Sequence, residues 1–220
     1  MKQRNALSAR RSSVRSLAVT AVMSALSAVL MYLEFSVPLV PDFLKYDFSD
    51  LPALLTAFGV GPWAGVTVEL LKNVIHLPVT QTGGVGELAN FLIGACFVLP
   101  AGLFYRLKGG KTGALIGSVI GTLLAAAVSL PVNYWITYPV YAQFMPMEAI
   151  LGLYRALNPV ATTLWRALLM FNLPFTVVKE SVNVVITFLV YKKISPLLHG
   201  GRQNHKNPDV QKKGPSGNDV

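Results

Sequence analysis

Cysteine, charge and catalytic motifs are all scarce in this sequence. Its single cysteine, Cys96, lies in an apolar stretch, which excludes a disulfide framework and a CxxC metal site and leaves ordinary packing as its simplest role. There is no HExxH, GxSxG, P-loop or glycine-rich nucleotide fingerprint, so we expect neither a familiar enzyme nor an ATP site. Only 13% of the residues are charged, roughly half the share in a typical soluble protein.

Long apolar runs dominate the rest of the chain. Hydrophobic residues make up 53% of the sequence, and its mean hydropathy is +0.51. A helix needs about 20 apolar residues to cross a bilayer, and four stretches reach that length, at 14–34, 86–106, 113–138 and 168–193. A fifth, 51–77, is interrupted by the glycines and proline of GVGP. The sequence therefore predicts an all-α integral membrane protein.

The distribution of basic residues decides how the interrupted stretch is arranged. We compare one kinked span with two helices, 51–58 and 63–77, joined by GVGP. With two helices, the five basic residues before the first span, the three at 106–111 and the six from 192 onward share one side, against three on the other. With one span, the last two groups change sides and the bias is lost. The positive-inside rule thus selects six segments with cytoplasmic N- and C-termini.

The short second helix has a consequence for function. Residues 51–58 span only about 12 Å of helix and cannot cross the membrane alone. Such a helix is tolerated where it faces protein or a polar cavity, so we expect a cavity beside residues 45–65, with KYDFSD entering its mouth from outside. The prediction is a six-helix transmembrane bundle in one domain, 1–195, with an outer connection over 139–167 that has room for a short helix. A disordered cytoplasmic tail, 196–220, follows.

Ionisable and amide side chains recur at helical spacing in three of the apolar segments. Such residues are costly inside a membrane and usually face a protein interior. The three stripes are Glu69, Lys72, Asn73 and His76; Glu87 and Asn90; and Asn172, Thr176, Lys179, Glu180, Asn183 and Thr187. Each stripe lies on one helix face. We interpret them as walls of a polar pocket, because amides and charged groups supply the donors and acceptors that a polyhydroxylated ligand needs.

Two features allow more than one interpretation. Glu69 with Lys72, or Lys179 with a nearby carboxylate such as Glu87 or Glu180, could form structural pairs that only neutralise each other. Small residues at four-residue spacing flatten a helix face for close packing, either inside the protein or against a partner. They are Ala21 and Ala25 in the first segment, and Gly113, Gly117, Gly121 and Ala125 in the fifth.

Several motifs together resemble the riboflavin-specific S components (RibU family) of energy-coupling factor (ECF) transporters. They are LKYDFSDLPAL, the GPWAG turn, ELLKNVIHL, TGGVGELANFLIG and FVLPAG. The resemblance extends from about residue 16 to residue 195, and FNLPFTVVKESVN belongs to it. It implies a six-helix subunit of the cell membrane that captures riboflavin from outside and passes it inward. A transmembrane coupling subunit and two ATP-binding subunits would be its partners.

The resemblance also implies roles for particular residues. An outer loop, 36–50, would cap the ligand cavity with Lys45, Asp47 and Asp50. The implied vitamin contacts are Glu87, Asn90, Asn133, Asn172, Lys179 and Asn183, and Ala21 and Ala25 would contact the coupling subunit. No cofactor and no metal are implied, because riboflavin is the transported ligand.

Three other functions remain compatible with the residues. An S component for a different vitamin or precursor would keep the architecture and lack a yellow chromophore. A self-sufficient secondary transporter would use charges such as Glu69 and Lys179 as a proton relay, although no internal repeat supports it. An intramembrane enzyme would need an unfamiliar arrangement of residues.

Overall fold

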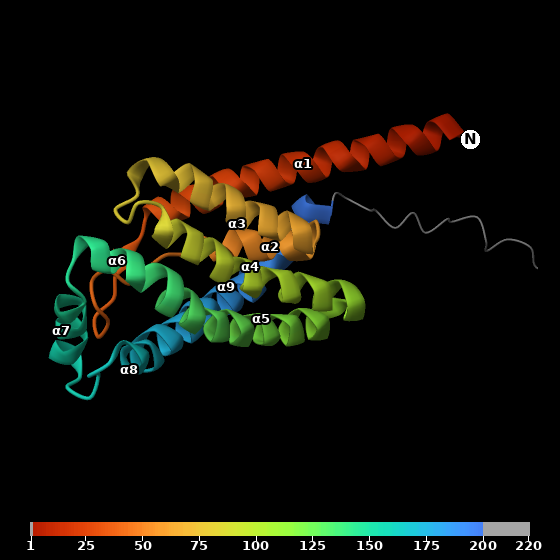
Figure 1. The fold of residues 1–220 in the computed structure, drawn as a ribbon. Coiled ribbons are helices and arrows are strands. Elements are labelled where there is room, and N and C mark those ends of the chain that lie inside the picture. Colours follow the sequence, from red (N-terminus) through yellow and green to blue (C-terminus); the bar gives the residue numbers. More distant parts are fainter. Residues whose placement is uncertain (1, 200–220) are drawn as a thin grey trace, which may run out of the picture.

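The computed structural model describes the backbone of residues 2–199 and the side chains of residues 13–191. These residues are almost entirely helical (Figure 1). The elements in chain order are α1 (Lys2–Tyr32), β1 (Phe35–Ser36), β2 (Lys45–Tyr46), α2 (Asp50–Gly59), α3 (Pro62–His76), η1 (Leu77–Val79), α4 (Val85–Lys108), α5 (Gly110–Val132), η2 (Asn133–Thr137), α6 (Tyr138–Phe144), α7 (Met147–Leu157), α8 (Leu164–Ala167), η3 (Leu168–Asn172) and α9 (Leu173–His199). The predicted tail from residue 196 lies outside the described residues, apart from its first four positions in α9.

Four helical stretches are long and apolar enough to cross a membrane. They are Ser13–Tyr32, Val85–Lys108, Gly110–Phe144 and Leu164–Tyr191. Each overlaps one of the long apolar runs of the sequence, because most residues in such a run can face lipid or packed protein. The third stretch is longer than the predicted segment 113–138, since α5 continues through η2 into α6 without a break.

The interrupted stretch forms two helices, α2 and α3, which meet at a glycine turn. Gly61 has a φ of 149°, a backbone conformation that residues with a Cβ rarely adopt, and Pro62 then begins α3. The side chains of α2 are buried along nearly its whole length. Protein therefore covers this ten-residue helix, as expected for a segment too short to cross the bilayer.

The small residues of α5 pack against α4. Gly113, Gly117 and Gly121 are buried, and a Cβ built on Gly117 would lie 2.7 Å from the carbonyl oxygen of Ala101 in α4. The glycine face therefore serves close packing inside the protein. Ala21 and Ala25 of α1 are instead exposed, so a packing role within the described residues does not account for them.

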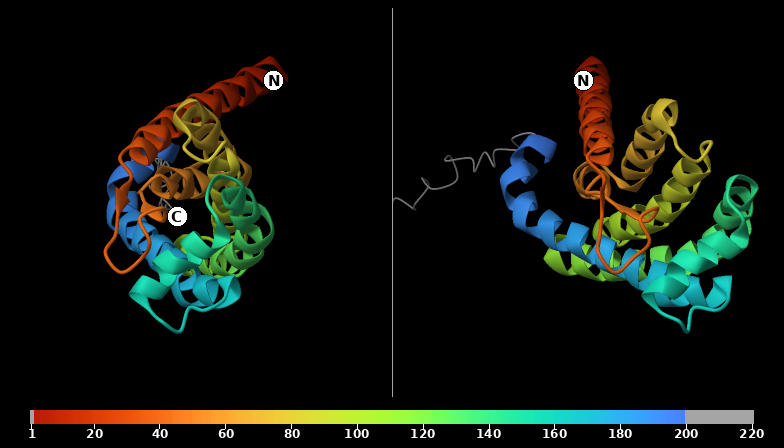
Figure 2. Two further views of the ribbon diagram at one scale, coloured as in Figure 1. Left: turned by 60° about the vertical axis from the view of Figure 1, so that its left-hand side comes forward. Right: turned by 90° about the vertical axis from the view of Figure 1, so that its left-hand side faces the viewer.

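The connection predicted over 139–167 is largely helical and holds parts of α6, α7 and α8. It lies at the same end of the molecule as the loop between α1 and α2, as both views of Figure 2 show. We call this the loop end. A small apolar core fills it, formed by Tyr138, Ile150, Tyr154, Ala161, Ala167 and Leu168, with Phe43 packed against it. The main core lies among α2, α3, α4 and α5 and includes Leu54, Val68 and Phe97. In the described residues α6 continues α5 and α8 leads into α9, so α7 is the addition and gives seven helices where the sequence predicts six.

Candidate functional site

A cavity of about 570 Å³ lies at the loop end. Its volume is within the roughly 300–1,000 Å³ of small-molecule pockets. Seven of the predicted site residues line it: Lys45, Asp47, Glu87, Asn90, Asn133, Asn172 and Lys179. Apolar and aromatic side chains complete the wall, among them Met31, Phe43, Tyr141, Phe144 and Phe175. Asp50 and Asn183 are 1% and 0% exposed and contribute no lining in the described part of the chain.

The polar stripes predicted from helical spacing face the protein interior. All members of the α3 stripe and of the η3–α9 stripe are buried, and so is Glu87. Lys72, Glu69 and Asn183 are fully buried, at 0% exposure. The prediction that these side chains avoid lipid is therefore confirmed. Only some of the stripe residues line the cavity, and the others are buried behind its wall.

Two π-helical turns carry the asparagines of the cavity. Asn133 is the first residue of η2, and Asn172 is the last residue of η3. Each turn contains the residue four positions before a proline, Pro139 or Pro174. Proline cannot donate to that carbonyl and its ring collides with it, so the helix widens locally. Such π turns are frequent at functional sites, and here each one brings an amide to the cavity.

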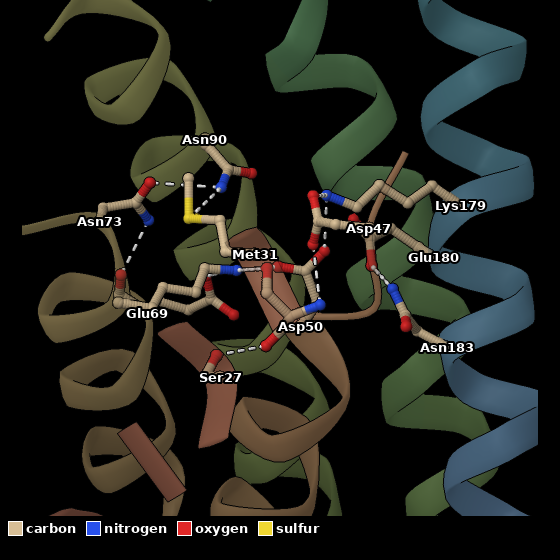
Figure 3. Close-up of polar contacts among 12 residues, drawn as sticks. Ser27, Met31, Asp47, Asp50, Glu69, Asn73, Asn90, Lys179, Glu180 and Asn183 are labelled. Carbon is tan, nitrogen blue, oxygen red and sulfur yellow. Dashed lines mark hydrogen bonds and ion pairs between the residues drawn. The ribbon is translucent and has the colours of Figure 1, made fainter. Parts of the chain in front are cut away.

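Lys179 joins the last helix to the loop between α1 and α2. Its Nζ lies 3.1 Å from Oδ2 of Asp47 and 3.0 Å from Oδ2 of Asp50. Figure 3 shows the Lys179 and Asp47 side chains pointing toward one another. Oδ1 of Asp47 accepts the backbone N–H of Ser49 at 2.7 Å, which fixes the chain just before α2. These bonds tie the loop to the wall of the cavity.

Lys72 neutralises a second group of carboxylates beside the cavity. Its Nζ lies 2.7 Å from Oε2 of Glu69 and pairs with Asp50. It also donates to Oγ of Ser49 at 2.8 Å. A buried charge is tolerated only when it is paired and hydrogen-bonded, and this lysine satisfies both conditions. The Glu69–Lys72 pair therefore exists, as one sequence interpretation proposed, whereas Lys179 pairs with Asp47 and Asp50.

On the opposite wall, hydrogen bonds hold Glu87 and Asn90 in place. Oε1 of Glu87 lies 2.9 Å from Nδ1 of His76, and Oε2 accepts from Oγ1 of Thr80 at 2.8 Å. Nδ2 of Asn90 donates to Oδ1 of Asn73 at 3.2 Å, and these two amides face each other in Figure 3. His76 also lines the cavity and thus helps to orient Glu87.

Aromatic rings surround the part of the loop nearest to the cavity. Phe43 packs edge-on at 5.7 Å from the ring of Tyr154 and 6.2 Å from that of Tyr138. Phe35 and Tyr46 pair across the two short strands, and burial raises the pKa of Tyr46 to about 12. The loop is therefore held by packing as well as by ion pairs.

Sequence reasoning did not identify Phe43 and Tyr154 as part of the site. Both belong to connecting segments outside the predicted membrane helices, and the three polar stripes did not extend to them. The signal available for Tyr154 is its four-residue spacing from Ile150 on the apolar face of α7. For Phe43 the sequence offers only an aromatic residue in a loop.

A family model described as ECF transporter, substrate-specific component, matches residues 15–191. "Riboflavin transporter FmnP" from Bacillus subtilis (strain 168) is 31% identical over 195 residues, covering 87% of this chain and 98% of that protein. "Riboflavin transporter RibU" from Staphylococcus aureus (strain TCH60) is 32% identical over 177 residues, covering 80% and 88%.

A solved structure is also similar to this chain. It is described as the S component of a bacterial ECF transporter, and the two chains superpose with a TM-score of 0.68 at 29% sequence identity. The match covers 84% of this chain and 98% of that one. Sequence and fold therefore agree over most of the chain's length.

Proposed function

This chain belongs to the substrate-specific components of ECF transporters, and we propose that it binds riboflavin outside the cell and delivers it inward as part of such an importer. Members of this family are transporter subunits rather than enzymes. Riboflavin is the transported ligand and no cofactor takes part. Among the vitamins that the architecture could hold, the two relatives named as riboflavin transporters favour this one.

The observation that carries the proposal is the chemistry of the cavity wall. Riboflavin has a flat ring with polar edges and a chain of hydroxyl groups. The wall offers both kinds of partner, with rings such as Tyr141 and Phe175 beside the amides of Asn133 and Asn172 and the ammonium of Lys179. Mostly apolar pockets with a few placed polar groups are typical of specific small-molecule sites.

We divide the predicted site residues by their distance from the cavity. Those that line it are proposed to contact the ligand: Lys45, Asp47, Glu87, Asn90, Asn133, Asn172 and Lys179. Asp50 and Asn183 support them from behind the wall. Asp50 holds Lys179, and Asn183 donates to Oε2 of the wall residue Glu180 at 3.4 Å.

The segment 36–50 serves as the cap of the cavity in this proposal. It contributes Phe43, Lys45 and Asp47 to the lining, and it is held by Lys179 and by the rings around Phe43. Entry of a ligand would require these contacts to loosen, because they hold the segment against the cavity wall. Riboflavin capture then ends with the cap returning to the position seen here.

Titration of the purified protein with riboflavin tests the function directly. Binding quenches flavin fluorescence, and we expect saturable quenching by the unchanged chain. Asn172→Ala should weaken binding by about 1–3 kcal/mol, because an unpaired ligand group remains in the cavity. Asn158→Ala is the matched control, since Asn158 only caps the backbone N–H of Val160 at 3.0 Å. Equal affinities for all three proteins would remove Asn172 from the site.

We propose that α1, α2, α3, α4, α5 and α9 are the six membrane segments, with the loop end outside and both termini cytoplasmic. The positive-inside rule supports this orientation. Labelling with a membrane-impermeant maleimide tests it in a Cys96→Ser background with one new cysteine at an exposed position, either Leu39→Cys in the loop or Lys111→Cys in the first turn of α5. Intact cells should label the first and spare the second. The reverse pattern would invert the topology.

The exposed small residues of α1 are proposed to contact the transmembrane coupling subunit, which in turn binds two ATP-binding subunits. Ala21 and Ala25 are exposed small side chains one helical turn apart on α1, where another helix can approach closely. The double variant Ala21→Leu/Ala25→Leu should bind riboflavin normally and lose uptake in cells. Ala127→Leu, at an exposed alanine of α5, is the control. Normal uptake by the double variant would place the coupling surface elsewhere.

A further inference from the structure

Three buried side chains at the loop end form a closed ring of hydrogen bonds. Tyr154 of α7 donates to Oδ1 of Asn172 at 2.7 Å. Nδ2 of Asn172 lies 3.4 Å from the hydroxyl of Tyr138, and the two tyrosine hydroxyls bond to each other. Tyr138 and Tyr154 are 1% and 0% exposed. Of the three residues, Asn172 alone reaches the cavity wall.

The directions of these bonds follow from what each atom can do. Oδ1 of an amide can only accept, so the hydroxyl of Tyr154 must be its donor. Burial raises the pKa of Tyr154 above its ordinary value, which keeps that hydroxyl protonated. Tyr138 then donates to Tyr154 and accepts from Nδ2 of Asn172. One direction of donation therefore satisfies the whole ring.

This ring holds the Asn172 amide at both of its polar atoms. A turn of 180° would exchange Oδ1 and Nδ2, but each tyrosine hydroxyl can donate or accept, so the ring would close again with its bonds running the other way. The ring therefore fixes where the amide lies and how its plane is oriented. One N–H and one lone pair of the amide remain outside the ring and are available to a ligand.

We propose that Tyr154 is a positioning residue for ligand binding, which fixes the orientation of the Asn172 amide without touching the ligand. The proposal rests on the proposed function, since it concerns the affinity of the same cavity. It gives the connection between α6 and α9 a role in recognition. Packing supports the role, because the Tyr154 ring is held between Phe43 at 5.7 Å and Phe171 at 5.3 Å and cannot easily turn away.

The test is a double-mutant cycle on riboflavin affinity, measured on the folded, monodisperse fraction of each purified protein. Tyr154→Phe removes one hydroxyl and keeps the ring. We expect the dissociation constant to rise roughly three- to tenfold, as for the loss of one net hydrogen bond. In an Asn172→Ala background the same change should alter it less than twofold. The absorption bands of bound flavin should shift in Tyr154→Phe, because an amide of the cavity wall is no longer fixed.

Two further variants keep the result decisive. Tyr138→Phe removes the other tyrosine hydroxyl from the ring of hydrogen bonds. Its effect on riboflavin affinity should show the same coupling to Asn172, so the conclusion does not depend on the folding of one variant. Tyr105→Phe is the matched control, since it removes a hydroxyl that bonds to Tyr191 at 2.9 Å away from the cavity, and it should leave affinity and spectrum unchanged.

Each outcome has one meaning. If the losses of riboflavin affinity caused by Tyr154→Phe and Tyr138→Phe disappear in the Asn172→Ala background, the positioning role is supported. An unchanged affinity in Tyr154→Phe overturns it, and so does a loss that persists undiminished in that background, since the tyrosine would then act through general packing. A wild-type protein that does not bind riboflavin would contradict the proposed function instead.

Discussion

Replacing Lys179 by methionine tests the bridge between the last helix and the loop. Methionine keeps the length of the side chain and removes the ammonium group, which lies 3.0 Å from Asp50 and 3.1 Å from Asp47. The two carboxylates would then lose a shared cation in a place where they are 1% and 5% exposed. We expect both the stability of the protein and its affinity for riboflavin to fall.

The magnitude follows from what the carboxylates retain. Removing one partner of a buried ion pair costs about 3–5 kcal/mol. Asp50 keeps its pair with Lys72, and Asp47 keeps the backbone N–H of Ser49, so we expect the lower end, about 3 kcal/mol. For a chain of this size that corresponds to a fall of roughly 6–12 °C in melting temperature. Loss of a charged hydrogen bond to the ligand would weaken riboflavin binding roughly tenfold or more.

The assay is thermal unfolding in detergent, with and without riboflavin. Lys45→Met is the matched control, because Lys45 is exposed and donates only to Oγ of Ser36 at 2.7 Å, and its melting temperature without riboflavin should stay close to that of the wild type. Adding Asp47→Asn to Lys179→Met removes one unpaired carboxylate charge, so the double variant should recover part of the lost melting temperature. If Lys179→Met melts like the wild type, and Asp47→Asn gives no recovery, Lys179 does not bridge these carboxylates.

Three further predictions concern helix packing, the cap and ligand charge. Gly117→Ala should destabilise the protein by about 1–3 kcal/mol in thermal unfolding, because its Cβ would press on the carbonyl of Ala101 at 2.7 Å. Phe43→Ala should speed riboflavin release roughly tenfold in stopped-flow fluorescence, since contacts between aromatic rings are worth about 0.5–1.5 kcal/mol each. Riboflavin phosphate should bind at least about tenfold more weakly than riboflavin in the same titration, because carboxylates outnumber ammonium groups in the described cavity wall.

Each of these has a matched control and a contrary result. Gly152→Ala adds a methyl that meets nothing within 4 Å, and equal melting temperatures for both alanine variants would refute the close contact of α4 and α5. Leu39→Ala changes a loop residue that is 82% exposed, and release as fast as in Phe43→Ala would show that the ring contacts do not hold the cap. The penalty on the phosphate should shrink at high salt, and equal or tighter binding of the phosphate would contradict the charge argument.

Helical periodicity was sufficient to predict which side chains avoid lipid. Glu69, Lys72, Asn172 and Lys179 carry polar groups in apolar helices, and the cost of exposing such groups to hydrocarbon leaves them only an interior position. The GVGP break, combined with the count of basic residues on the two sides, indicated that the stretch 51–77 divides into two helices, as α2 and α3 do.

Partners across the fold were beyond the reach of the sequence. Glu69 and Lys72 are three residues apart, so helix geometry alone brings them together. Lys179 and Asp47 are separated by 132 residues, and several carboxylates in the sequence could have competed for this lysine. Which one it binds depends on how the loop folds back onto α9, and no local pattern records that.

The bounds of α7, for which the sequence only left room, and the two π turns could not be predicted for a related reason. Pro139 and Pro174 indicate a disturbance, yet proline alone predicts a kink as readily as a widened turn. The orientation of Asn133 and Asn172 depends on that difference. Tyr154 reaches Asn172 only because α7 packs under the loop, which is a property of the tertiary structure.

The visible absorption spectrum of the protein, purified in detergent from cells grown with riboflavin, tests the central claim most directly. If the cavity at the loop end holds riboflavin as tightly as a capture subunit requires, the flavin bands will copurify with the protein, and Asn172→Ala will reduce them. A colourless wild-type preparation that also fails to take up added riboflavin would contradict the account.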